Sequence, residues 1–393
     1  MKKILIVAPP FSGHLNALKG LMAEYHHEFE FHILITGWTN LPPDLTDVTV
    51  PARIMALYEL HDTDPLHFTL PRAAGLVAQC EANVRKIEPD LIIYDFFSLE
   101  AHVVSKKLGI PAWCSISAFI GPYLHKEVML ANLEEERNAA ALRILGLRKE
   151  DLEMVSDGLL ATGELNIIWS YPAVTPANYM ENRKPSRYVF GGYLACKPIE
   201  KKADRPTTEN ALVYFSLGTI VMNTLWNSDP ELRERLKLLV GLLAEQWRDK
   251  PFRVLFAHQG KTVLSEYPPN WCSVAQVDQK KTLSEASLFI THAGANSLHE
   301  AIANKVPMLA VPFFGDQLLA ADRIAELGIG KNVAPGRDIS TTRSTDFINE
   351  VLAERIDVGV RQMLDKRDYY AKNFEGLATG AENICRLISD SLR

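Results

Sequence analysis

The chain has 393 residues, more than a single hydrophobic core usually supports, so its length favours two domains. Hydrophobic residues make up 47% and charged residues 23% of the sequence, which is typical of a globular protein and excludes a disordered one. The formal net charge of −6 argues against nucleic acid or an anionic membrane as the main partner.

The cysteines and the N-terminal sequence predict a cytoplasmic protein. The five cysteines are scattered without a C-x-x-C pair, which favours reduced thiols over a disulfide framework or a zinc site. The first residues, MKKILIVAPPF, contain an apolar run that two prolines interrupt, so they predict a first strand and not a signal peptide. No apolar run approaches the roughly 18 residues of a membrane helix, so we expect no transmembrane segment.

The first half of the chain alternates between strand and helix patterns. Strands are predicted at 3–8, 31–36, 91–94 and 112–115. Between the first two, Leu15, Leu18, Leu21, Met22 and Tyr25 form one apolar stripe of a helix, and a later helix is predicted over 99–108. This βαβ alternation predicts a parallel, doubly wound sheet of the α/β class.

The alternation resumes in the second half after a linker. Residues 119–160 are rich in Leu, Met and Ala and are predicted to be mostly helical, and the polar, proline-containing segment 197–208 is predicted to be the linker. Further strands are predicted at 211–216, 253–257, 273–277, 288–290 and 308–311, and the tail after residue 344 is predicted to be helical.

The most informative stretch runs from 289 to 317 and reads FITHAGANSLHEAIANKVPMLAVPFFGDQ. It contains two apolar strand patterns, each followed by small or polar residues. In an open α/β sheet, ligands bind at the carboxyl ends of the strands. The small residues at 293–295 let backbone N–H groups approach closely, and the N-terminus of the next helix attracts an anion. The pattern therefore predicts a diphosphate site.

This stretch resembles the donor-binding signature of the family 1 UDP-glycosyltransferases, which have the GT-B fold. The signature is approximately H-x-G-x-N-S-x-x-E, then a turn with proline, then D/E-Q. The matching positions are His292, Gly294, Asn296, Ser297, Glu300, Pro307, Asp316 and Gln317, with Gln279 and Leu283 upstream. In the first half, His14 of a Gly-His pair and Asp95 match as well.

The resemblance implies two Rossmann-like domains with doubly wound parallel sheets that face each other across a cleft. We expect residues 1–200 to form the acceptor-binding domain with the catalytic histidine, and residues 201–365 to form the domain that binds the nucleotide-sugar donor. Residues 366–393 are expected to form a C-terminal helix that crosses back to the first domain.

His14 and Asp95 are the predicted catalytic residues. A nucleotide sugar is already activated, so the reaction needs a base that removes the proton of the acceptor hydroxyl. Histidine can do so near neutral pH, and a carboxylate on its other nitrogen fixes the tautomer and stabilises the cation. Taken alone, each residue has a structural alternative: Gly-His is common in turns, and Asp before a helix is often an N-cap.

The resemblance also assigns the donor residues. His292, Gly294, Asn296 and Ser297 are expected to hold the phosphates, Glu300 the ribose hydroxyls, and Asp316 and Gln317 the sugar. Gln279 is expected to contact the donor, and Gly218 and Thr219, after the strand at 211–216, to line the phosphates. The alternatives are a capping box for Ser297 and Glu300, a helix N-cap for Asp316, and a simple turn for Gly218 and Thr219.

The sequence also departs from the plant members of the family. Gln276 stands where they have a tryptophan that stacks on uracil, and Ala295 replaces another tryptophan. These differences resemble bacterial natural-product enzymes, of the macrolide and antibiotic type, and they leave the choice between UDP and dTDP open. The D-x-D spacing of Asp62 and Asp64 is attributed to a solvated loop, so no metal site is predicted.

We therefore predict an inverting, metal-independent glycosyltransferase that moves a hexose, with glucose expected, from a UDP- or dTDP-sugar to a hydroxyl of a small, largely apolar acceptor. No tightly bound cofactor is expected. Phe11, Tyr123 and Met129 are predicted to line the acceptor pocket, although for each single residue of 119–160 ordinary packing in a helical core is the favoured alternative. The alternatives are another GT-B sugar-nucleotide enzyme, such as an epimerase or a lipid-sugar transferase, and a non-catalytic protein that binds nucleotide sugars.

Overall fold

The computed structural model describes residues 1–36, 53–57, 70–119, 135–155, 158–176, 187–194, 210–342 and 351–393. The chain divides into two compact units: unit 1 comprises Met1–Ala195 and Thr379–Arg393, and unit 2 comprises Cys196–Ala378. The boundary expected at 365 thus lies after residue 378, because α13 (Arg367–Lys372) packs into the core of unit 2 through Tyr370. The predicted linker at 197–208 lies outside the described residues.

Unit 1 is built on a parallel sheet, which has seven strands among the described residues. Their order is β3-β2-β1-β4-β5-β8-β9, and every neighbouring pair is parallel. The strands are β1 (Lys2–Ala8), β2 (Phe29–Thr36), β3 (Arg53–Leu57), β4 (Leu91–Asp95), β5 (Ala112–Ile116), β8 (Leu165–Ile168) and β9 (Tyr188–Phe190). The predicted parallel, doubly wound arrangement is confirmed for this unit.

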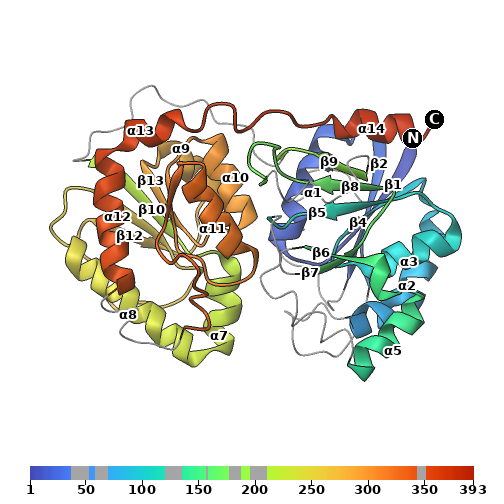
Figure 1. Cartoon of the computed structure of the whole chain (residues 1–393), viewed down its shortest axis with the longest axis horizontal. Helices are drawn as coiled ribbons and strands as arrows, with labels where there is room; N and C mark the ends of the chain where they lie inside the picture. Colours follow the sequence, from blue (N-terminus) through green and yellow to red (C-terminus); the bar gives the residue numbers. More distant parts are fainter. Residues whose placement is uncertain are drawn as a thin grey trace. The chain divides into compact units, whose positions relative to one another are not determined.

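Helices cover both faces of this sheet (Figure 1). On one face, Ile4 and Ile6 of β1 pack with α1 (Ser12–Tyr25) and α14 (Ile384–Ser391). On the other, Leu5 and Val7 pack with α2 (Leu70–Ile87) and α3 (Leu99–Leu108), and α5 (Glu136–Leu145) packs against α2. Because alternate β1 residues point to opposite faces, its unbroken apolar run is explained by burial on both sides.

The prediction that residues 119–160 are mostly helical is wrong for part of the described segment. α5 ends at Gly146, which adopts a left-handed conformation, and a short 3₁₀ turn (η2, Lys149–Asp151) follows. The chain then forms an antiparallel hairpin of β6 (Leu152–Val155) and β7 (Gly158–Ala161). The two strands pair from Leu152↔Ala161 to Val155↔Gly158, and the Leu, Met and Ala content of the region did not indicate them.

Unit 2 is built on a second parallel sheet, with six strands in the described part of the chain. Their order is β12-β11-β10-β13-β14-β15. The strands are β10 (Leu212–Ser216), β11 (Arg253–Ala257), β12 (Trp271–Val274), β13 (Leu288–Thr291), β14 (Met308–Ala310) and β15 (Gly330–Asn332). In both sheets, the strand order reverses beside the first strand of the unit.

The helices of unit 2 also cover both faces of their sheet, with α8 and α12 on one face and α9, α10 and α11 on the other (Figure 1). Besides α13, the helical segments in the described part of unit 2 are η5 (a π-helical turn, Ile220–Leu225), α7 (Trp226–Ser228), α8 (Pro230–Trp247), α9 (Gln279–Glu285), α10 (Ala295–Ala303), α11 (Asp316–Glu326) and α12 (Ala353–Asp365). Asp229 caps α8 by accepting from the backbone N–H of Leu232, and Pro230 begins the helix.

Two further observations bear on the sequence predictions. Cys80, Cys114, Cys272 and Cys385 are free thiols, as predicted for these four. None of the helices within the described ranges has the length and apolar character that a membrane span requires.

Candidate functional site

His14 and Asp95 lie at the carboxyl ends of adjacent strands in unit 1. His14 is in the first turn of α1, which follows β1, and Asp95 is the last residue of β4. β1 pairs with β2 on one side and with β4 on the other, so the strand order reverses between β1 and β4. Such a switch point is where open α/β sheets bind their ligands.

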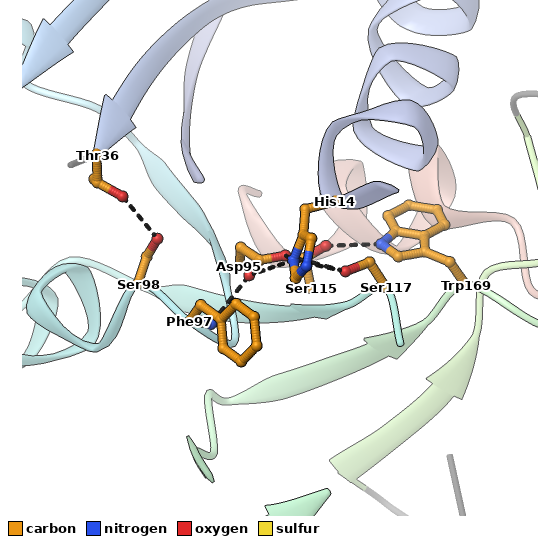
Figure 2. Close-up of polar contacts among 8 residues, drawn as sticks. All are labelled: His14, Thr36, Asp95, Phe97, Ser98, Ser115, Ser117 and Trp169. Atoms are coloured by element: carbon orange, nitrogen blue, oxygen red, sulfur yellow. Dashed lines mark hydrogen bonds and ion pairs between the residues drawn. The ribbon is translucent and has the colours of Figure 1, made fainter. Parts of the chain in front are cut away.

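The two side chains are in direct contact. The Nδ1 atom of His14 lies 2.9 Å from Oδ2 and 3.0 Å from Oδ1 of Asp95. Asp95 also accepts from the backbone N–H of Phe97 at 3.0 Å. Figure 2 shows that Ser117 completes the cluster, with its Oγ 3.0 Å from Nδ1 and 3.3 Å from Asp95 Oδ2. The two residues are 81 positions apart in the sequence, and the resemblance to the family implied their contact.

The environment of Asp95 suits a carboxylate that orients the His14 ring through a hydrogen bond. Asp95 has 0% exposure, and its hydrogen bonds to His14, Phe97 and Ser117 compensate for burial of the charge. It does not cap α3, whose N-cap position is Ser98. With a proton on Nδ1 directed at Asp95, the neutral imidazole has its lone pair on Nε2, where it can accept a proton.

Aromatic rings surround the imidazole. The ring of Phe97 stacks on His14 at a centroid distance of 4.9 Å, and Phe11, the residue before α1, lies at 5.8 Å. Both phenylalanines are half-buried. Tyr123 and Met129, the other residues predicted for the acceptor, lie outside the described residues. Sequence analysis missed Phe97 and Ser117, although Ser117 follows β5, the strand next to β4, and could have been found from that position.

A buried glutamate lies close to this cluster. Glu100, in the first turn of α3, is 1% exposed, and its Oε1 has no hydrogen-bond partner within the part of the chain that the structure describes. Burial raises the pKa of Glu100 from 4.5 to about 8; Arg72 opposes the shift and Asp95 adds to it. The native protein therefore favours the protonated acid at neutral pH.

This shift predicts a pH-dependent effect of Glu100→Gln on stability. Because the native pKa lies above the unfolded one, the carboxyl group imposes no penalty below pH 4.5, and stability is lost as the pH rises toward 8. Glutamine does not ionise, so the variant should gain about 2 to 3 kcal/mol relative to the wild type between pH 5.5 and pH 8, at about 1.4 kcal/mol per pKa unit. Urea unfolding at both pH values measures this gain. The exposed Glu136 of α5 offers a control, and an equal gain in Glu136→Gln would contradict the assignment.

In unit 2, residues that were predicted to bind the phosphates come together where the strand order of the second sheet reverses. β10 lies between β11 and β13, and Gly218 and His292 follow the carboxyl ends of β10 and β13. Gly218 has a φ of +80°, and a Cβ there would lie 2.3 Å from Cε1 of His292. A Cβ at Gly294 would lie 2.5 Å from Nε2 of the same ring. The imidazole therefore lies between two glycines. A larger residue at either position would displace the His292 ring.

His292 is neutral in this position. Burial lowers its pKa to about 4, and its Nδ1 is buried without a hydrogen-bond partner in the described parts of the chain. A neutral imidazole can donate one N–H to an anion without itself requiring a counter-charge. The chain reaches α10 through Ala293, which has a φ of +64° and whose N–H donates to Thr291 Oγ1 at 3.2 Å.

The start of α10 differs from the alternative that the sequence left open. The N-cap position is Gly294, which has no side chain, so Ser297 and Glu300 do not form a capping box. Instead, Gln279 Nε2 donates to Glu300 Oε2 at 2.5 Å and to Ser297 Oγ at 3.2 Å. The capping-box alternative is therefore wrong. The first turn of α10 contains Asn296 and directs backbone N–H groups without intrahelical acceptors toward the sheet edge.

Asp316 and Gln317 begin α11, which follows β14, the neighbour of β13. The N-cap position is Gly315, with a φ of +57°, so Asp316 is the first helical residue and the N-cap alternative is wrong. Gln317 is 4% exposed, and its Oε1 accepts from the backbone N–H of Phe313 at 3.0 Å. Its amide nitrogen therefore has a fixed direction.

Two more predicted positions lie at the same edge of unit 2. Thr219 is exposed and precedes η5. Gln276 is exposed after β12, and its Nε2 donates to Gln259 Oε1 at 3.4 Å. No group of three or more His, Cys, Asp or Glu side chains with the geometry of a metal site occurs among the described residues. Asp62 and Asp64 fall outside them.

The chain has the GT-B fold. CalG4, the calicheamicin glycosyltransferase, has a similar solved structure, with a TM-score of 0.65 at 18% identity over 100% of this chain and 98% of that one. VinC, solved in complex with DTDP, gives a TM-score of 0.65 at 16% identity over 98% of each chain. The predicted resemblance in fold to bacterial natural-product glycosyltransferases is confirmed.

Sequence comparison identifies the family. A sequence model described as UDP-glucoronosyl and UDP-glucosyl transferase matches residues 123–356, more than half of the chain. The chain belongs to this family of nucleotide-sugar glycosyltransferases. The NDP-glycosyltransferase YjiC of Bacillus subtilis (strain 168) is 29% identical over 321 residues, which cover 78% of this chain and 74% of the relative.

Proposed function

We propose that the protein transfers a hexose, with glucose expected, from a UDP- or dTDP-sugar to a hydroxyl of a small, largely apolar acceptor, with inversion at the anomeric carbon. The observation that carries this proposal is the His14–Asp95 contact at a switch point of the family's fold. A base held by a buried carboxylate is what direct displacement by an acceptor oxygen requires.

In this mechanism, His14 removes the acceptor proton through Nε2 as the oxygen attacks the anomeric carbon. Asp95 keeps the other proton on Nδ1 and stabilises the imidazolium that forms. Ser117 and the Phe97 N–H keep the carboxylate in place. Phe11 and Phe97 offer apolar contacts that favour an acceptor with an aromatic or hydrocarbon surface.

Unit 2 is assigned to the donor. His292 and the N-terminus of α10, with Gly218, Thr219, Gly294, Asn296 and Ser297, would hold the diphosphate and stabilise its charge as it leaves. Glu300 would accept from the ribose, with Gln279 beside it. Asp316 and the Nε2 of Gln317 would bind the sugar hydroxyls. This stabilisation is supplied by protein groups, so we expect transfer without an added metal ion.

The nucleotide is proposed to be UDP or dTDP. The description of the family names transferases that use UDP-sugars, and the structural relative VinC was solved in complex with DTDP. The structural relative CalG4 is described as the calicheamicin glycosyltransferase, and aromatic residues lie beside His14. Both observations support a natural product as the acceptor. A cytoplasmic location remains a prediction of the cysteine pattern.

The proposal predicts a defined sequence of results. In a thermal-shift panel of UDP, dTDP, GDP and their sugars, UDP or dTDP should raise the melting temperature and GDP should not. The best α-linked donor, incubated with phenolic and aliphatic alcohols, should yield a β-glycoside whose anomeric configuration is read by NMR. EDTA should leave the rate unchanged. An α-glycoside would contradict inversion, and stabilisation by none of the nucleotides would contradict the donor assignment.

A further inference from the structure

A buried tyrosine lies directly behind the donor residues of unit 2. Tyr214 is in β10, is 1% exposed, and pairs in register with Phe289 of β13. The two rings stack at a centroid distance of 4.7 Å with an angle of 7°. Their alternate neighbours Phe215 and Ile290 face the core with α8 and α12, so Tyr214 points to the face covered by α9 and α10.

The hydroxyl of Tyr214 connects the sheet to both helices. It donates to Oε1 of Gln279, the first residue of α9, at 2.9 Å. The Nε2 atom of the same amide donates to Glu300 Oε2 and Ser297 Oγ on α10. One amide thus joins the first strand of unit 2 to two of the α10 residues that the donor assignment uses, Ser297 and Glu300.

The directions of these hydrogen bonds follow from chemistry. An ionised carboxylate only accepts, so the amide must present its nitrogen to Glu300. The amide oxygen then faces Tyr214, which must donate. Burial raises the pKa of Tyr214 well above its ordinary value, with the Glu300 charge adding to the shift, so the phenol retains its proton. The network therefore has a single consistent arrangement.

We propose that Tyr214 is a positioning residue for the nucleoside part of the donor, acting through Gln279 to hold the Glu300 carboxylate ready for the ribose hydroxyls. This inference rests on the proposed function. Without the phenol oxygen, Gln279 Oε1 loses its donor, and only the two contacts of Nε2 to Glu300 and Ser297 hold the amide in place. The ribose must then order Glu300 as it binds, which weakens binding. The phosphate contacts, supplied by His292 and the start of α10, do not depend on this network.

The test compares ligands that contain and lack the ribose hydroxyl. Isothermal titration calorimetry measures the tighter of UDP and dTDP, its 2′,3′-dideoxy analogue, and inorganic pyrophosphate. Tyr214→Phe should weaken the nucleoside diphosphate about tenfold, as expected for loss of a buried hydrogen bond that orients a ligand group. The loss should be clearly smaller for the dideoxy analogue, and pyrophosphate should bind as to the wild type. In steady-state assays the donor KM should rise with little change in kcat.

Two further variants keep the inference falsifiable. Tyr370→Phe removes a hydroxyl from another buried tyrosine of unit 2, which lies in the core on the α8 and α12 face of the sheet, opposite to Tyr214, and should bind all three ligands normally. Gln279→Glu keeps the shape but places a second carboxylate against Glu300, so it should weaken the nucleoside diphosphate further than Tyr214→Phe does.

The outcomes separate the two ideas. If the wild type binds neither UDP nor dTDP, the proposed function fails. If the wild type binds and Tyr214→Phe loses the same factor for all three ligands, or loses none, the positioning role is overturned. Thermal unfolding of each variant shows whether it is folded at the temperature of the titration, and Gln279→Glu provides the same comparison if Tyr214→Phe does not fold.

Discussion

His14→Ala is expected to lower the rate of sugar transfer about 10³-fold while UDP or dTDP binds as tightly as to the wild type. The expected size follows from general-base catalysis, which typically contributes about 10² to 10⁴ in rate. The variant removes the base and leaves every residue assigned to the donor in place. Asp95 still accepts from Phe97 N–H and Ser117. Initial rates at saturating donor and calorimetry with the free nucleotide measure the two quantities.

Two companion variants show whether the loss belongs to the pair. Asp95→Asn keeps a hydrogen-bonding group beside Nδ1 but removes the charge that would stabilise the imidazolium, so it should also lower kcat strongly. His27→Ala changes a histidine whose side chain is 64% exposed and should transfer sugar at the wild-type rate. Normal turnover by His14→Ala with an acceptor that the wild type uses would remove the proposed base.

Gly218→Ala is expected to weaken nucleotide binding at least about tenfold, through strain and a clash that together cost on the order of 2 kcal/mol or more. The added methyl group would lie 2.3 Å from His292 Cε1 and 2.7 Å from Nδ1. Gly218 and Gly294 enclose the ring, so the imidazole must leave its position or the backbone must move. Either change displaces a group assigned to the phosphates. Calorimetry with UDP and dTDP measures the loss.

A second glycine separates the clash from the backbone strain. Gly336 of unit 2 has a φ of +66°, and a Cβ there would meet nothing within 4 Å. Gly336→Ala therefore carries a similar conformational cost without the contact to His292, and it should lower the melting temperature but bind nucleotide normally. Equal affinities for Gly218→Ala and the wild type would show that the position of His292 between the two glycines is not required for the donor.

The sequence predicted the positions of the strands that carry the site. β1, β4, β10 and β13 are apolar runs buried on both faces, and such runs can be recognised without tertiary information. Because parallel strands share a carboxyl edge, these positions placed His14 and Asp95 at the edge of one sheet and Gly218 and His292 at the edge of the other. The pairing of His14 with Asp95 itself was implied by the resemblance to the family.

Shorter strands could not be predicted because their signal is tertiary. β15 reads Gly-Lys-Asn, which has low strand propensity, and it pairs with β14 because Gly330 allows an approach in which a Cβ would lie 2.0 Å from Met308 O. β8 and β9 extend the sheet of unit 1 from a region in which the sequence gives no clear alternation.

The hydrogen-bond partners were also beyond the sequence. Ser297 and Glu300 have the spacing of a capping box, and local reasoning favours that motif. The structure pairs both with Gln279 because α9 and α10 lie side by side over β10, which no local pattern encodes. The identity of the donor residues was therefore easier to predict than the network that orients them.

The final helix has a consequence for how the molecule is made. Ile384, Cys385 and Ile388 of α14 are buried in the same core as Ile4 and Ile6 of β1, and Glu382 N–H donates to Phe190 O at 2.7 Å. During synthesis, the segment Cys196–Ala378 emerges whole and can fold before the N-terminal half has received its last piece. The first half to leave the ribosome is thus the last to be completed. A chain that stops before Ile384 would leave open to water the part of this apolar face that α14 covers.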